Sequence, residues 1–192
     1  MTPTDRRLAF LIEFSGLPLE RYKSESLLEA AKTPVLVRLR KDLQAFLSGD
    51  PGRVREANGE VWGIVPQLSG DIRHKIAALS FAELVELHAE VKEFLLHALE
   101  EKARVRATVP QTIQLSLWFP KKGRFLTLRS ETLVDHFRLI LHLLTVRGAD
   151  QKLRRCVAPD CGKVFVRYRK KMFCSTQCGD RDRQKRHRTL LK

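Results

Sequence analysis

The chain has 192 residues, of which 43% are hydrophobic, so it can bury an apolar core and wholesale disorder is excluded. This length suffices for one ordinary domain and a small module, but not for two full-sized domains. The 36 lysines and arginines outnumber the 22 acids, and no run approaches the roughly 20 apolar residues that cross a bilayer.

The N-terminal apolar segment is the first predicted element. Residues 8–12 are apolar and follow two arginines, an order that faintly resembles a signal peptide. Glu13 interrupts the run, however, and no small-residue cleavage site follows it. We therefore interpret residues 8–12 as a buried strand or the start of a helix, and we expect a cytoplasmic protein.

Two helices and an irregular stretch are predicted next. Residues 24–32 have the composition of a short helix. A threonine before Pro34 resembles a capped helix start, and apolar residues at helical spacing carry that helix to Gly49. Residues 53–70 lack a clear period, so we expect them to be irregular apart from a short strand over residues 61–65.

The strongest helical pattern covers residues 81–104. Ser80 and Glu83 form a capping box at its start. A single apolar stripe follows at helical spacing, made of Leu84, Leu87, Val91, Leu95 and Ala98.

Beyond this helix the apolar period changes from helical to alternating. Residues 113–119 alternate as in a half-buried strand, a turn follows, and residues 125–128 are the expected returning strand of a hairpin. A helix over residues 131–146 comes next and ends at Gly148. Residues 1–150 are therefore predicted to be an α+β domain, mostly helical with at least one β-hairpin.

No catalytic motif stands out in residues 1–150. A zinc-protease HExxH motif, a glycine-rich phosphate loop and a nucleophile elbow are all missing from the sequence. We therefore do not expect an enzyme. Histidines occur singly on predicted helices and are interpreted as surface or satisfied core residues: His74, His88, His97, His136 and His142.

Residues 151–192 form a separate, strongly basic module. They hold 14 of the 36 lysines and arginines and three acids, hence +11, whereas residues 1–150 hold 22 bases and 19 acids, hence +3. Such asymmetry points to a polyanionic partner that is reached through one end of the chain.

All four cysteines lie in this module, with the spacing Cys156-x4-Cys161-x12-Cys174-x3-Cys178. In a chain without an export signal, clustered cysteines favour a metal over disulfides. Two close pairs supply the four thiolates that zinc takes in a tetrahedron, and a closed set of four favours a structural Zn²⁺ site. Another metal, or free or redox-active thiols, are the alternatives.

The module is predicted to be a treble-clef-like finger. A tight turn separates the first two cysteines, residues 163–171 form a short strand pair or an extended loop, and Cys178 lies in the first turn of a helix. A unit of about 40 residues buries too little surface to fold alone. Structural zinc supplies on the order of 10–16 kcal/mol to such a unit.

A basic helix is the last predicted element. Arg181, Lys185 and Arg188 share one stripe, and Asp182 can pair with Arg186 four residues later. Phosphates would satisfy this charge through arginine forks and counterion release. The candidate nucleic-acid-binding residues are Arg167, Arg169, Lys170, Lys171, Arg181, Arg183, Lys185, Arg186 and Arg188. An acidic protein partner, or a solvated tail with no specific partner, are the alternatives.

The C-terminal segment resembles the CGNR zinc-finger family. The four cysteines, Phe165 and the run Cys178-Gly179-Asp180-Arg181 carry the resemblance, with Asp180 where the family has Asn and Phe173 where Trp usually precedes the third cysteine. The resemblance implies an N-terminal ABATE domain before the finger and a role as a bacterial transcription regulator.

The expected function is therefore DNA-binding transcription regulation, with an RNA-binding or protein-docking adaptor as the alternative. A treble-clef nuclease would need a catalytic histidine in its hairpin, and residues 162–173 contain none. No membrane partner is expected. Sensing of a small molecule and homodimerisation are the roles left open for residues 1–150.

Overall fold

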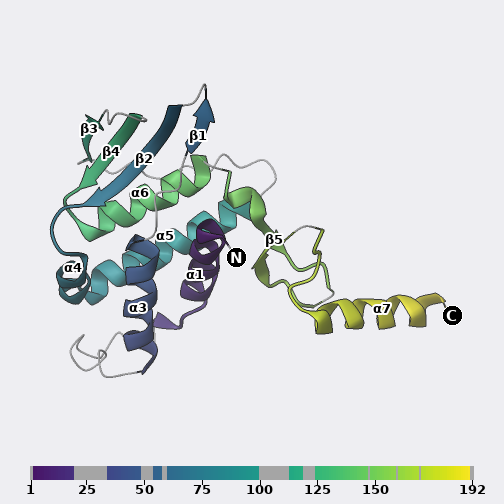
Figure 1. Cartoon of the computed structure of the whole chain (residues 1–192). Coiled ribbons are helices and arrows are strands. Elements are labelled where there is room, and N and C mark those ends of the chain that lie inside the picture. The colour runs from purple at the N-terminus through teal and green to yellow at the C-terminus, as the bar shows by residue number, and fades with distance from the viewer. Residues whose placement is uncertain are drawn as a thin grey trace.

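The structure is a computed structural model that describes residues 2–19, 34–48, 54–57, 60–99, 113–118, 124–146, 148–158, 160–168 and 170–190. Helices form the body of the molecule, a four-stranded sheet lies at one side of it, and the C-terminal helix extends away from it (Figure 1). The predicted α+β class, mostly helical, is confirmed. Within the described ranges, no helix has both the length and the apolar character that crossing a bilayer requires.

The helices are α1 (Pro3–Ser15), α3 (Pro34–Ser48), α4 (Ile72–Ala78), α5 (Phe81–Leu99), α6 (Leu133–Val146) and α7 (Thr176–Leu190), with a short 3-10 helix at Asp150–Lys152. The strands are β1 (Val54–Ala57), β2 (Glu60–Leu68), β3 (Ile113–Trp118), β4 (Arg124–Ser130), β5 (Leu153–Arg155) and β6 (Val164–Val166). Helix α4 and the short 3-10 helix are the described helices that the sequence analysis did not predict.

The N-terminal apolar segment is helical. Thr2 and Asp5 form a capping box, because the Thr2 hydroxyl accepts the Asp5 N–H and the Asp5 carboxylate accepts the Thr2 N–H. Buried Arg7 joins α1 to α3, since its Nε donates to the Phe46 carbonyl at 3.1 Å. Helix α3 begins at the predicted Pro34. The predicted helix over residues 24–32 and the stop at Gly49 lie outside the described residues.

The larger sheet has the strand order β1-β2-β4-β3. Strands β3 and β4 form the predicted antiparallel hairpin, with Leu115 opposite Leu128, while its turn lies outside the described residues. Strands β2 and β4 are parallel, with Ile64 opposite Leu126, so the chain must cross over between them. Helix α6 packs against both of these strands and covers one face of the sheet (Figure 1).

The short strand expected over residues 61–65 is confirmed as part of β2, whereas the expectation that the rest of residues 53–70 is irregular is wrong for the described residues. Strand β1 and the nine-residue strand β2 occupy most of it. Pro66 lies within β2, although proline offers no N–H to a ladder. Strand β1 pairs only with residues 60–62 of β2. Pro66 therefore lies beyond the part of β2 that β1 covers, where its missing N–H costs no bond to β1.

Helix α5 begins at the predicted capping box. The Ser80 N–H donates to the Glu83 carboxylate at 2.8 Å, and the Glu83 N–H donates back to the Ser80 hydroxyl at 3.2 Å. The predicted apolar stripe of α5 faces the core, and Leu87 and Val91 are fully buried. The described helix ends at Leu99, and residues 100–104 lie outside the described part of the chain.

Helix α6 begins two residues later than predicted and ends where predicted. Thr132 caps its start, because its hydroxyl accepts the Asp135 N–H at 3.0 Å. Gly148 has a φ of +64°. The Gly148 N–H donates to the Thr145 carbonyl and the Ala149 N–H to the Leu144 carbonyl, which is the Schellman pattern.

Aromatic rings fill the centre of the core. Phe14 lies edge-on to His88, with 5.3 Å between ring centroids, and Phe46 lies 4.8 Å from Phe137. His136 is also buried, and its Nδ1 lies 2.9 Å from the Ser130 hydroxyl. Burial lowers the pKa of His136, and the charge of Arg7 adds to that effect. His136 is thus a neutral, hydrogen-bonded core residue.

The apolar core continues across residue 150. Leu153 of β5 and Val166 of β6 are buried in the same cluster as residues of α1 and α5. Lys152 Nζ lies 2.9 Å from an oxygen of Asp5, whose side chain is only 6% exposed. The start of the C-terminal module is therefore packed against the N-terminal end of α1.

Candidate metal centre

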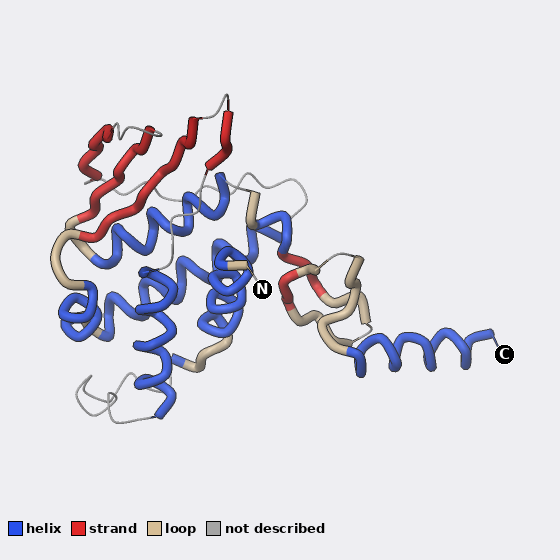
Figure 2. The backbone as a smooth tube through the Cα atoms, viewed as in Figure 1, coloured by secondary structure: helices blue, strands red, loops and turns tan. Residues whose placement is uncertain are grey.

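A short hairpin carries the first pair of cysteines. Strands β5 and β6 are antiparallel, with Arg154 opposite Phe165. Cys156 directly follows β5 and Cys161 precedes β6, so both cysteines lie in the loop that joins these strands (Figure 2). A strand pair within residues 163–171 is therefore not formed, because β6 takes its partner from before Cys156.

The hairpin loop turns sharply enough to bring its two cysteines together. Asp160 and Gly162 have φ values of +63° and +57°, a left-handed conformation that aspartate tolerates and glycine adopts freely. The Cys161 N–H donates to the Ala158 carbonyl at 3.2 Å, and the Cys156 N–H donates to the Lys163 carbonyl at 2.8 Å. These bonds fix the backbone on both sides of the turn.

The second pair of cysteines lies at the start of α7. Cys174 precedes the helix by two residues, and Cys178 is in its first turn, as predicted. Ser175 caps the helix, since its hydroxyl accepts the Cys178 N–H at 3.3 Å. This cap sets where the helix begins and therefore how Cys178 faces the other three cysteines.

The four sulfur atoms are arranged as ligands of one ion. They all lie within 4.8 Å of one another and form no disulfide. The Sγ atom of Cys174 lies 3.6 Å from that of Cys161 and 3.5 Å from that of Cys178, and the remaining Cys161–Cys178 distance is 3.6 Å. A tetrahedron with Zn–S bonds of about 2.3 Å has edges of about 3.8 Å. The four cysteines fit one structural zinc ion.

The surroundings of the sulfurs favour thiolates at two positions. Burial raises the pKa of Cys156, but the backbone N–H groups of Cys174 and Ala158 outweigh it and leave that pKa below its ordinary value. A hydrogen bond with the Ser175 side chain, then one with Cys174, lowers the pKa of Cys178 to about 6.

The pKa of Cys174 is shifted in the opposite direction. Burial and the neighbouring thiols raise the pKa of Cys174 to about 12. Metal ligation requires all four sulfurs as thiolates, and a bound cation would supply the charge that makes this possible. Zinc binding would therefore have to displace the proton of Cys174.

Arg181 contacts the cysteine cluster directly. Its Nη2 donates to the Cys178 sulfur at 3.2 Å, and this bond raises the pKa of the guanidinium. Four thiolates around one Zn²⁺ leave a net charge of about −2, which one guanidinium partly offsets. The sequence analysis assigned Arg181 to nucleic acid, whereas its contact in the structure is with a metal-ligating cysteine.

The rest of the Cys178-Gly179-Asp180-Arg181 run also has a local explanation. A Cβ atom at Gly179 would lie 3.4 Å from Phe173 Cδ2, so the helix backbone at Gly179 lies directly against the Phe173 ring. Phe173 packs against the cysteine cluster. Asp180 accepts a hydrogen bond from Arg183 one turn later. Each residue of the run therefore supports either the metal ligands or the first turns of α7.

The predicted nucleic-acid-binding residues that the structure describes lie on α7 and in the loop between β6 and α7. Those within the described residues are all exposed: Arg167, Lys170, Lys171, Arg181, Arg183, Lys185, Arg186 and Arg188. Lys171 Nζ lies 5.9 Å from the centre of the Phe165 ring. Arg183 and Arg186 form ion pairs with Asp180 and Asp182, the second of which was predicted. Arg169 lies outside the described residues.

Two supporting residues were missed by the sequence analysis. Ser175 stands three residues before Cys178, which is the cap-to-third-residue spacing of a helix start, so its role was open to prediction. The contact of Lys152 could not be predicted from local sequence, because its partner Asp5 lies 147 residues earlier in the chain.

A hairpin with two cysteines in its loop, followed by a helix that supplies the last ligand, defines this module as a zinc finger. The family model described as CGNR zinc finger matches residues 152–189, in agreement with the resemblance found in the sequence. No curated protein and no solved structure shows a significant match to the chain.

Replacing Arg181 with alanine is expected to weaken zinc binding by about 10- to 100-fold, as loss of a group that supports metal ligands commonly does. Arg181→Lys should recover part of the loss, because an ammonium can still donate to the Cys178 sulfur. Competition with a chromophoric chelator measures the affinity. Arg188→Ala is the matched control, since it removes an exposed arginine two turns further along α7. Equal zinc affinities for the two alanine variants would show that Arg181 does not support the centre.

Proposed function

We propose that this protein binds nucleic acid through α7 and acts as a DNA-binding transcription regulator. The observation that carries the proposal is the position of α7, a basic helix of 15 residues whose first turn is held by the cysteine cluster and whose remainder extends away from the body (Figure 1). A helix of this length is about 22 Å long, and its sides are open to a partner.

The charges on α7 suit a polyphosphate. The helix contains five lysines and arginines and two aspartates. The Arg183 and Arg186 side chains are 77% and 69% exposed in their ion pairs with Asp180 and Asp182. Exposed pairs of this kind contribute little stability, so phosphate groups can replace the aspartates at small cost. Arginine forks bind phosphate through two parallel hydrogen bonds.

Double-stranded DNA matches the shape of α7 better than double-stranded RNA. The major groove of B-form DNA is about 12 Å wide and admits an α-helix. The corresponding groove of A-form RNA is deep and narrow, and side chains cannot read it. An RNA-binding or protein-docking adaptor remains the alternative, since structured RNA or an acidic protein would also attract the charge.

The division of the chain belongs to the same proposal. Residues 151–192 would be the nucleic-acid-binding part, and residues 1–150 an ABATE-like domain, which the layout of the chain supports. The packing of Leu153 and Val166 into the core beside α1 would keep α7 in a defined position relative to that domain.

Competition binding tests the choice of partner. Duplex DNA, duplex RNA of the same sequence and an acidic protein would compete for the zinc-loaded full chain at one salt concentration, with fluorescence anisotropy as the readout. We expect duplex DNA to bind at least about tenfold more tightly than the others, a difference of about 1.4 kcal/mol. A tenfold preference for RNA or for the acidic protein would overturn the DNA assignment.

A further inference from the structure

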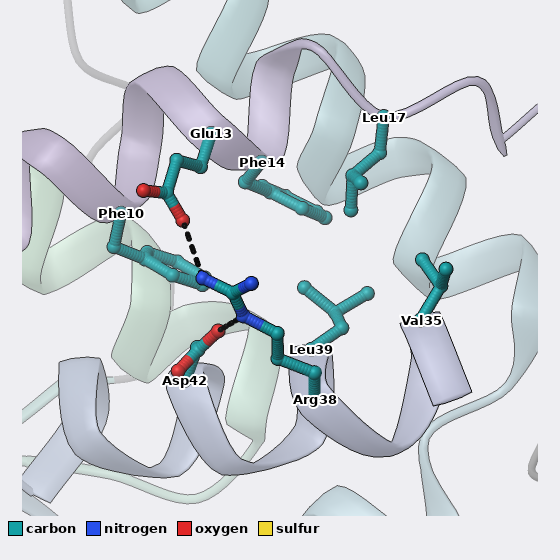
Figure 3. Close-up of a pocket in the computed structure, with 8 residues that line it drawn as sticks. All are labelled: Phe10, Glu13, Phe14, Leu17, Val35, Arg38, Leu39 and Asp42. Atoms are coloured by element: carbon teal, nitrogen blue, oxygen red, sulfur yellow. Dashed lines mark ion pairs between the residues drawn. The ribbon is translucent and has the colours of Figure 1, made fainter.

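A cavity of about 390 Å³ opens between α1 and α3, far from the cysteine cluster in the sequence (Figure 3). This volume lies within the range of sites that hold small molecules, which is roughly 300–1,000 Å³. The residues that line it are Phe10, Glu13, Phe14 and Leu17 of α1 and its C-terminal flank, and Val35, Arg38, Leu39 and Asp42 of α3.

The inner wall of the cavity is apolar and firmly held. Phe10, Phe14 and Leu39 are all at least nine-tenths buried, so only a small part of each side chain faces the cavity. The Phe10 and Phe14 rings stack with 5.6 Å between centroids and 9° between planes. Phe10 also lies 5.0 Å from Phe46 in the core. A ligand would therefore meet a preformed aromatic surface, which limits the entropy cost of binding.

The rim of the cavity carries three charges, two negative and one positive. Arg38 Nη2 lies 3.6 Å from a Glu13 oxygen, and Arg38 Nε lies 3.4 Å from an Asp42 oxygen (Figure 3). Both distances exceed the usual 2.7–3.2 Å of an N–H···O hydrogen bond. The two carboxylates thus keep acceptor capacity for a further donor.

We propose that this cavity binds a small apolar monocation, such as a protonated arylalkylamine. The aromatic wall would take the apolar body, and Glu13 and Asp42 would accept hydrogen bonds from the ammonium group. The site lies apart from the proposed nucleic-acid-binding helix and does not depend on it.

Charge balance selects a cation over an anion. The lining residues hold one guanidinium and two carboxylates, so a bound monocation brings their sum to zero. A carboxylate ligand would instead be the third anion around Arg38 and would have to displace Glu13 or Asp42.

Three probes of similar shape and different charge test the proposal on the full zinc-loaded chain. They are 2-phenylethylamine, which is a cation at neutral pH, neutral 2-phenylethanol and anionic 3-phenylpropanoate. Amide chemical shifts in NMR titrations report both affinity and location. We expect the amine to bind about fivefold more tightly than the alcohol, the upper end for one exposed ion pair, and to shift amides of α1 and α3. Equal affinities for the three probes, or shifts confined to other elements, would overturn the proposal.

Two pairs of variants distinguish the contribution of the cavity wall to amine binding from that of the two carboxylates. Val35 and Val37 of α3 are both 41% exposed, but only Val35 lines the cavity. Val35→Trp should abolish amine binding and Val37→Trp should leave it unchanged. The double variant Glu13→Gln, Asp42→Asn should bind amine and alcohol equally, whereas Glu93→Gln on α5 should keep the preference. A preference for amine that survives the double variant would contradict the assigned role of the carboxylates.

Discussion

Replacing Cys174 with serine is expected to release the zinc ion and to unfold the cysteine loops and α7, while the body of the protein stays folded. A serine hydroxyl does not ionise near neutral pH and is a poor zinc ligand, so three thiolates would remain. The free energy of structural zinc binding, on the order of 10–16 kcal/mol, is also the folding free energy of such a module. The cluster around the sulfurs has few other buried residues, namely Ala158 and Phe165.

The structure limits how far this unfolding should spread. Leu153 is fully buried in the core beside α1, and Lys152 is paired with buried Asp5. Val166 of β6 is buried in the same core, so strands β5 and β6 should persist when the metal is lost and unfolding should be confined to the cysteine loops and α7. The first 150 residues keep their own helices and sheet, because none of them supplies a sulfur ligand.

Three measurements check this prediction. Atomic absorption should show that zinc falls from one ion per chain to near zero, circular dichroism should show a loss of helix, and trypsin should cleave α7 rapidly at its arginines and lysines. Met172→Ala is the control, since Met172 is 55% exposed in the same loop and is not a ligand. Full zinc content and unchanged trypsin resistance of the Cys174→Ser variant would contradict a structural metal site.

Local sequence signals predicted most of the helices because capping and apolar spacing act within a few residues. The capping box of Ser80 and Glu83 and the left-handed Gly148 are such signals, and both are confirmed. Only residues 61–65 of strand β2 were predicted, because its pairing with β4 joins residues about 60 positions apart and no local pattern encodes the full length of that contact. Helix α4 was not predicted, because a helix of seven residues is too short to show a clear apolar period.

The metal ligands were predictable for the same local reason, and their supporting contacts were not. Four clustered cysteines in two pairs give the ligand set directly, whatever the rest of the chain does. The contact of Arg181 with Cys178 depends on where α7 begins, because the two residues are three positions apart and face each other only when both are helical.

The basic residues of the module therefore divide into groups with different tasks. Arg181 contacts a metal-ligating cysteine, and Lys152 holds the module against α1. The other cations of α7 and its preceding loop are the candidates for phosphate contact. A test of nucleic-acid binding must spare Arg181, since changing it would disturb the metal centre and the helix together.

The proposed DNA binding is expected to depend steeply on salt. If six or more of the candidate cations contact phosphates, affinity should fall about a thousandfold between 50 and 200 mM salt, because each contact releases condensed counterions. The double charge reversal Lys185→Glu, Arg188→Glu removes two such cations from one stripe of α7. It should weaken binding and make the slope of log K against log salt less negative by about two.

The matched control reverses two exposed cations elsewhere, Lys41→Glu in α3 and Arg73→Glu in α4. It changes the net charge by the same amount, so it reports what overall charge alone does to affinity. If α7 is the interface, the control should keep the wild-type slope, because the number of counterions released at the contact is unchanged. Equal slopes for the two double variants would exclude this stripe of α7 as the DNA contact, and zinc content measured on the same samples would show that the finger was intact in both.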